Sequence, residues 1–185
     1  MTNRLNQDMT WVNEPTSWRQ DRDELIVRSD RQTDFWRITH DGGVRDNGHI
    51  WRQPVRGDFD ASVSVSGQYK DQYDQAGLMV RCDASNWLKC GIELKDGIQY
   101  ASVVVTREYS DWSVVRLDQP EKIWLQVQRR AETFEVSYSL GGRQYQLMRQ
   151  AYLPAPESVD AGPMIASPIG AGFEVAFTEL QVTPA

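Results

Sequence analysis

The chain has 185 residues, of which 40% are hydrophobic, and its formal net charge is -6 with an isoelectric point near 5.0. This charge argues against non-specific binding to nucleic acid or to an anionic membrane. The apolar content is sufficient for a full core and excludes a disordered chain. The N-terminal residues lack the apolar segment of a signal peptide, and no apolar run reaches the length of a membrane span. We therefore expect one domain over residues 1-185 in a reducing cytoplasm.

Helical periodicity is almost absent, and short runs typical of β-strands follow one another along the chain. The early runs are Glu24 to Arg28, Asp34 to Ile38, His49 to Arg52 and Phe59 to Gln68. Three strands between Gln75 and Thr106 come next. The later runs are Asp111 to Leu117, Lys122 to Arg129, Thr133 to Leu140, Gln144 to Ala151, Gly162 to Ser167 and Phe173 to Val182. So many short strands predict an all-β fold, a two-sheet antiparallel jelly-roll β-sandwich, with a crossover led by Pro154-Ala155-Pro156.

The three central strands fix a detailed register. Asp96-Gly97 supplies the turn residues of a two-residue hairpin, so Lys95 pairs with Ile98. The hairpin then sets Glu93 opposite Tyr100, Gly91 opposite Ser102 and Lys89 opposite Val104. Pairing Cys82 with Leu88 on the core side sets Arg81 opposite Lys89 and Met79 opposite Gly91.

The face of these strands that points away from the core is the candidate functional surface. Two cations opposite each other, Arg81 and Lys89, are unfavourable unless Glu93 or a bound anion lies between them. A closure from Lys70 to Gln75 would set Ser64 of the preceding strand beside Arg81. Serines and glycines reduce bulk, which predicts a groove. Its predicted rim aromatics are Trp36, Trp51, Tyr69, Tyr73, Trp87, Tyr109 and Trp112.

Other candidate groups carry weaker signals. His40 and His49 match no zinc spacing, so hydrogen bonding in a loop is favoured over a metal or general-base role. Calcium would need more oxygen ligands than the pairs Asp58/Asp60 or Asp71/Asp74 provide, and no cofactor is expected. Cys82 and Cys90 are expected to be free thiols.

Several blocks, in order along nearly the whole chain, resemble one known family. They are Trp11 to Pro15, Thr33 to Arg37, Asp46 to His49, Gln75 to Arg81, Asn86 to Lys89, Val103 to Thr106, Tyr109 to Val114 and Tyr138 to Gly142. The family is the domain-of-unknown-function family 1349, also called the regulation-of-enolase family. The resemblance implies a concanavalin A-like β-sandwich, the architecture of lectins and many glucanases. It implies no established reaction, because fold does not fix function.

The leading functional prediction is a non-catalytic carbohydrate-binding β-sandwich that takes a sugar or sugar phosphate. Its predicted ligand-binding residues are Arg81, Lys89, Glu93, Tyr100, Trp87, Ser64, His49, Trp36 and Trp112. The first alternative is a module that binds a protein partner, for instance a metabolic enzyme. The second is a glycoside hydrolase, which needs two carboxyl groups across the scissile bond, whereas no paired-carboxylate run accompanies Glu93.

Overall fold

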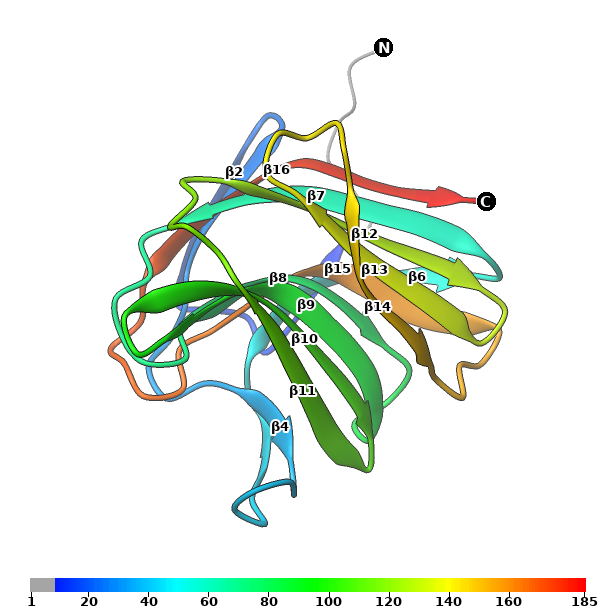
Figure 1. Ribbon diagram of the computed structural model, residues 1–185, viewed down its shortest axis with the longest axis horizontal. Coiled ribbons are helices and arrows are strands. Elements are labelled where there is room, and N and C mark those ends of the chain that lie inside the picture. The colour runs from blue at the N-terminus through cyan, green and yellow to red at the C-terminus, as the bar shows by residue number, and fades with distance from the viewer. Residues whose placement is uncertain (1–8) are drawn as a thin grey trace.

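The computed structural model describes residues 9–185 as two packed antiparallel sheets and a small hairpin (Figure 1). The first sheet has the strand order β1 (Thr10–Val12), β6 (His49–Arg56), β15 (Ser158–Ala166), β8 (Gln75–Arg81), β9 (Asn86–Lys95), β10 (Ile98–Arg107), β11 (Tyr109–Arg116). The second has the order β14 (Gln146–Tyr152), β13 (Thr133–Ser139), β12 (Ile123–Arg130), β7 (Phe59–Gly67), β16 (Glu174–Pro184), β3 (Glu24–Arg28), β2 (Ser17–Asp21). The hairpin pairs β4 (Phe35–Arg37) with β5 (Val44–Asp46).

This arrangement confirms the predicted all-β, two-sheet antiparallel concanavalin A-like jelly-roll sandwich. The core lies between the sheets, where alternate residues of facing strands are fully buried, as in Leu78 of β8 and Val63 of β7. The Pro154 to Pro156 segment connects β14 of the second sheet with β15 of the first, as the sequence predicts. None of residues 9–185 forms a helix long and apolar enough to cross a membrane.

The predicted register of the β9–β10 hairpin is confirmed. Lys95 pairs with Ile98 and Glu93 pairs with Tyr100. Asp96 and Gly97 both have positive φ, at 53° and 74°, so the two-residue turn leaves no freedom in the pairing.

The predicted register of β8 against β9 is wrong by two residues. Arg81 pairs with Trp87 and Met79 pairs with Lys89, so Arg81 and Lys89 are not opposite each other. Likewise, Leu88 pairs with Val80 rather than Cys82, and Gly91 pairs with Gly77 rather than Met79. The turn between β8 and β9 is tightened by Asp83, whose carboxylate accepts hydrogen bonds from the backbone N–H groups of Ser85 and Asn86. A shift of two residues leaves every side chain on its predicted face.

The predicted neighbour of β8 is also wrong. The strand β7 belongs to the second sheet, and β8 pairs with β15 instead. Asp74 organises the loop between the two sheets, because its carboxylate accepts the N–H groups of Lys70 and Asp71 and the hydroxyl of Ser167. Ser64 consequently lies on the outer face of the other sheet and does not approach Arg81.

Candidate functional site

The β4–β5 hairpin, residues 33–48, lies over the outer face of the first sheet. Phe35 anchors it and is fully buried, with its ring centroid 6.3 Å from that of Trp87. The other members of this second apolar cluster are Ile50, Met79, Val104 and Met164, contributed by β6, β8, β10 and β15. Where the hairpin covers this face, it therefore fills the groove that the sequence predicts.

Both cations of the predicted site take their negative partners from the hairpin. Arg81 makes a bidentate ion pair with Asp46, with N–O distances of 2.6 and 2.8 Å. Lys89 is 3% exposed and donates to the carbonyl of Phe35 at 2.6 Å and to Asp34 at 3.3 Å. The ion-pair partners of the two cations are thus Asp46 and Asp34 of the hairpin, which were not predicted for this role.

Glu93 forms the polar centre of the part of the face that the hairpin leaves uncovered. It is 7% exposed, and its carboxylate accepts the Ser102 hydroxyl at 2.6 Å. Ser102 in turn accepts the indole N–H of Trp112 at 3.0 Å. Burial raises the pKa of Glu93 above its ordinary value, although Lys89 and Ser102 act in the opposite direction.

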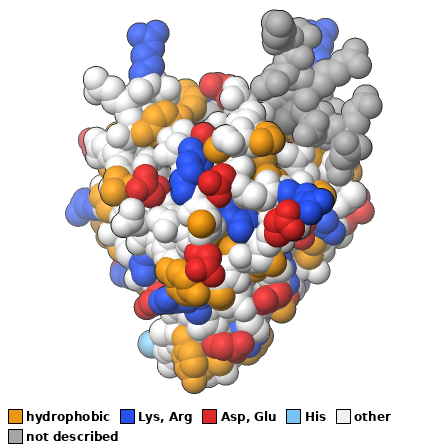
Figure 2. Space-filling model, turned by 90° about the vertical axis from the view of Figure 1, so that its right-hand side faces the viewer, with side chains coloured by type: hydrophobic (Ala, Val, Ile, Leu, Met, Phe, Trp, Pro, Cys, Tyr) orange, Lys and Arg blue, Asp and Glu red, His pale blue; other side chains and the backbone are white. Residues whose placement is uncertain are grey.

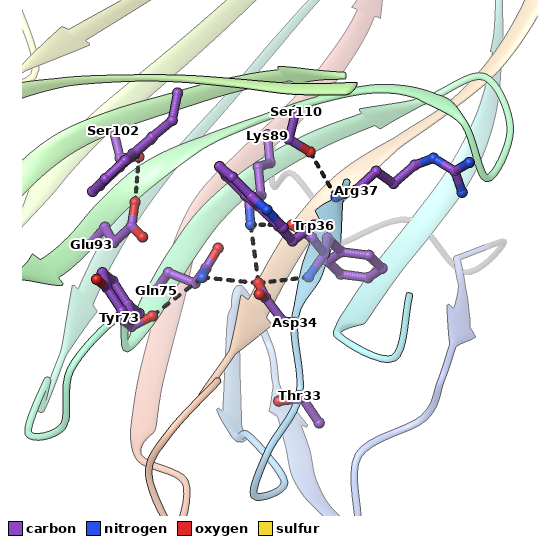
Figure 3. A network of polar contacts seen from close by, with 12 residues as sticks. Thr33, Asp34, Trp36, Arg37, Tyr73, Gln75, Lys89, Glu93, Ser102 and Ser110 are labelled. Atoms are coloured by element: carbon purple, nitrogen blue, oxygen red, sulfur yellow. Dashed lines mark hydrogen bonds and ion pairs between the residues drawn. The ribbon is translucent and has the colours of Figure 1, made fainter. Parts of the chain in front are cut away.

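A small cavity of about 10 Å³ opens beside this carboxyl group. We call it the Glu93 recess, and its lining residues are Gln75, Lys89, Cys90, Gly91, Ile92, Glu93, Ser102 and Met164. Figure 3 shows Trp36 and Asp34 on one side of Gln75, with Glu93, Ser102 and Tyr73 on the other. The volume admits one water-sized group.

Two aromatic residues bond to lining residues of the Glu93 recess: Trp112 to Ser102 through its indole N–H, and Tyr73 to Gln75 through its backbone carbonyl. The rings of Tyr73 and Trp112 meet edge to face with centroids 6.3 Å apart. Tyr73 has φ = 67°, a strained conformation for a bulky residue, and its N–H donates to the carbonyl of Leu94 at 2.7 Å. Strained residues of this kind gather at functional sites more often than elsewhere.

Gly77 and Gly91 have a different role from the one predicted for them. They pair with each other across β8 and β9, and a Cβ atom on Gly77 would lie 1.9 Å from the carbonyl oxygen of Cys90. A Cβ on Gly91 would lie 2.0 Å from the carbonyl oxygen of Ala76. These glycines permit close approach of two backbones rather than opening a trough.

Of the remaining predicted ligand-binding residues, Tyr100 lies beside Glu93, whereas Ser64 and His49 are engaged elsewhere. Tyr100 is half-buried on β10 opposite Glu93. Ser64 is buried on the second sheet and bonds to Thr178 at 2.6 Å. His49 is 2% exposed; its Nε2 accepts the N–H of Asp30, and its Nδ1 lies 2.5 Å from the carbonyl oxygen of Asn13. His49 thus joins the start of the chain to β6.

The metal and thiol candidates are accounted for within the described residues. Across residues 9–185, no three His, Cys, Asp or Glu side chains gather as metal ligands. Cys82 and Cys90 are free, as predicted. Burial raises the pKa of the Cys90 thiol to about 12 and that of Cys82 to about 11, so neither is an activated nucleophile.

The prediction of ligand-binding residues missed two polar residues that line the recess, Gln75 and Ser102, and also Asp34, which bonds to Gln75. Ser102 could have been predicted, because the correct β9–β10 register sets it two pairs away from Glu93 and on the same face of the sheet. Asp34 and Gln75 could not, since only the folded hairpin brings residue 34 to within 3.3 Å of the Gln75 amide.

The fold is a β-sandwich that also occurs in solved structures of carbohydrate-active proteins. A carbohydrate-binding module, CBM66 from Bacillus subtilis, superposes with a TM-score of 0.60 at 14% identity, covering 97% of this chain and 99% of that one. The GH43 BlXynB protein from Bacillus licheniformis superposes with a TM-score of 0.77 at 16% identity, covering 98% of this chain but 37% of that one. At such identities the likeness establishes the fold alone.

The chain belongs to the family described as "Protein of unknown function (DUF1349)", whose model matches residues 11–185. "Regulation of enolase protein 1" of Saccharomyces cerevisiae is 38% identical over 175 residues, covering 94% of this chain and 88% of that protein. A crystal structure of a functionally unknown protein from the same yeast superposes with a TM-score of 0.93 at 36% identity, covering 96% of this chain and 97% of that one. The resemblance found in the sequence is confirmed.

Proposed function

We propose that this protein is a non-catalytic module that binds a neutral carbohydrate at the Glu93 recess. The observation that carries the proposal is the chain of hydrogen bonds from Trp112 through Ser102 to Glu93 beside a cavity of one-hydroxyl size. A buried carboxyl group held in this way presents a fixed partner to a hydroxyl group.

The rings around the recess supply the second half of sugar recognition. The C–H faces of a pyranose ring pack on indole and phenol rings, while its hydroxyls need fixed polar partners. Trp36, Tyr73 and Trp112 are all half-buried, so part of each ring remains exposed to solvent. One hydroxyl of the ligand would enter the recess, and the sugar ring would stay among the aromatic side chains.

The charges of the site favour a neutral sugar over a sugar phosphate. The predicted phosphate partners, Arg81 and Lys89, are already paired with Asp46 and Asp34. An anionic ligand would have to compete with two carboxylates fixed in place. Over the described part of the face shown in Figure 2, acidic and basic side chains are interspersed.

The same contacts favour binding over hydrolysis. The charge of Asp34 acts on Glu93, but the Asp34 carboxylate already accepts hydrogen bonds from Lys89, Gln75 and the backbone N–H of Phe35. Hydrolysis requires both carboxyl groups to reach the scissile bond and, in the inverting case, space for a water between them. The volume beside Glu93 is about 10 Å³, which does not hold a glycosidic linkage.

Calorimetric titration with a panel of neutral oligosaccharides tests the proposal. We expect saturable binding that Glu93→Ala and Ser102→Ala each weaken about tenfold or more, since each removes a buried partner of a hydroxyl. Glu135→Gln is the control, because Glu135 lies on the second sheet, where its carboxylate accepts the side-chain amide of Gln150. Absence of binding to every sugar, or binding that survives both substitutions, would refute the proposal.

A second function is favoured by the name of the yeast relative, "Regulation of enolase protein 1". On this alternative the module binds a metabolic enzyme in the cytoplasm, in keeping with its two free thiols. Purified enolase is the appropriate probe. Co-elution of one stoichiometric complex in gel filtration, unaffected by sugars, would support this alternative, and separate elution would oppose it.

A further inference from the structure

The β4–β5 hairpin is a fixed wall beside the Glu93 recess. Its base is held by Asn47, whose side chain donates to the carbonyl of Gln32 at 3.0 Å and accepts the N–H of Asp34 at 2.9 Å. The backbone N–H groups of Asn47 and Gly48 both donate to the carbonyl of Asp34. The two ends of the hairpin are thereby locked together.

The body of the hairpin is attached to three strands of the sheet beneath it. It reaches β8 through the Arg81–Asp46 pair and β9 through Lys89. At β11, the N–H of Arg37 donates to the Ser110 hydroxyl at 2.9 Å. The guanidinium of Arg37 also pairs with Glu108 at 3.0 Å. A segment attached across β8, β9 and β11 blocks the path of any extended ligand over that part of the sheet.

Trp36 is a residue of the hairpin whose ring is held in one orientation. Its indole N–H donates to the carbonyl of Thr39 at 2.7 Å, which fixes the orientation of the ring. Figure 3 shows the Trp36 side chain across Gln75 from Glu93 and Ser102. The hairpin therefore borders the recess through Asp34, which bonds to the lining residues Gln75 and Lys89.

A polysaccharide that is bound through its interior must enter and leave a site at two ends. At the Glu93 recess, the hairpin blocks one of these two exits. We infer that the recess binds the terminal unit of a neutral sugar chain and excludes interior units. This inference rests on the proposed carbohydrate-binding function and adds the part of the chain that is recognised.

Linear and cyclic oligosaccharides of equal size distinguish binding of a terminal unit from binding of interior units, because a cyclic chain has no terminal unit. The probes are maltohexaose against α-cyclodextrin, linear against cyclic β-glucan, and xylo-oligosaccharides of increasing length, each titrated by calorimetry. We expect the cyclic partner of a bound linear sugar to bind at least about tenfold more weakly. We also expect one protein molecule per linear chain, whatever its length.

Equal affinity for the cyclic sugar, or a number of bound protein molecules that rises with chain length, would overturn the terminal-unit inference while leaving carbohydrate binding intact. If none of these probes binds, both the inference and the proposed function fail. Trp36→Ala is expected to reduce the preference for the linear sugar. Trp18→Ala, on β2 of the second sheet, is the control and should leave the preference unchanged.

Discussion

Lys89 and Asp34 lie 55 positions apart in the chain, and their side chains meet at 3.3 Å under the hairpin. The ammonium group also donates to the backbone carbonyl of Phe35, so one buried cation ties the hairpin to the middle of the first sheet. This contact closes most of the groove that the sequence predicts and leaves the Glu93 recess as its remaining part.

Removing the Lys89 charge should therefore destabilise the protein strongly. Lys89→Met leaves Asp34 and the Phe35 carbonyl without their buried donor, and a broken buried pair typically costs about 3–5 kcal/mol. Urea unfolding followed by fluorescence measures the change. Lys95→Met serves as control, because that side chain is 34% exposed and its ion pair with Asp96 lies at the surface. A similar stability for both variants would contradict the structural role of Lys89.

The Phe35 anchor should be equally important for stability. Phe35→Ala empties a fully buried position between Trp87 and Met79, and such truncations cost about 3–5 kcal/mol. The exposed Ile169 provides a comparison, since Ile169→Ala removes a side chain that is 65% exposed and should change the free energy of unfolding by less than about 0.5 kcal/mol. Thermal denaturation of both variants distinguishes an anchored hairpin from a loosely attached one.

The close approach of β8 and β9 at their paired glycines makes a separate prediction. Gly77→Ala places a methyl group 1.9 Å from a backbone carbonyl oxygen, so the strands must move apart, and we expect a loss of about 1–3 kcal/mol. Gly141→Ala is the matched control, because nothing lies within 4 Å of its added Cβ. Equal effects in a urea titration would show that the two strands tolerate the separation.

Glu93 should make stability depend on pH in an unusual direction. Burial raises its pKa in the folded state above the ordinary value of 4.5, so the folded protein binds more protons than the unfolded chain above that pH. Stability contributed by the protonated acid is therefore present at low pH and is lost as pH rises through the folded-state pKa. Glu93→Gln removes this dependence. The difference in melting temperature between wild type and Glu93→Gln should grow in favour of the variant as pH rises above about 4.5; a constant difference would contradict it.

The sandwich was predictable because its signals are local. Period-two alternation assigns each side chain of β7, β8 and β9 to the core or the outer face, and the positive-φ turn at Asp96-Gly97 sets the register of β9 with β10. The β8–β9 register depends on a turn tightened by Asp83, and the place of β7 depends on a loop that passes from one sheet to the other. The alternation of apolar and polar residues contains no information about either.

The site was predictable only in part for the same reason. Glu93 and Trp112 lie on strands in which successive side chains point to opposite faces of the sheet. Their place on the outer face therefore follows from the sequence. Asp34 and Trp36 reach that face on a hairpin that pairs with neither large sheet. Its position is set by the burial of Phe35 and by three long-range ion pairs, and contacts between residues so distant in the chain have no local signature.

The indole resonance of Trp112 offers the most direct test of the Glu93 recess as a sugar-binding site. Its N–H donates to Ser102, which donates to Glu93, so a hydroxyl entering the recess must alter that hydrogen bond. The chain has seven tryptophans, whose indole signals can be assigned by substitution in a nitrogen-15 correlation spectrum. Titration with a neutral oligosaccharide should shift the Trp112 signal saturably, while Trp18 on the second sheet stays unchanged, and Glu93→Ala should abolish the shift. A Trp112 signal that does not move while a sugar binds would contradict the account.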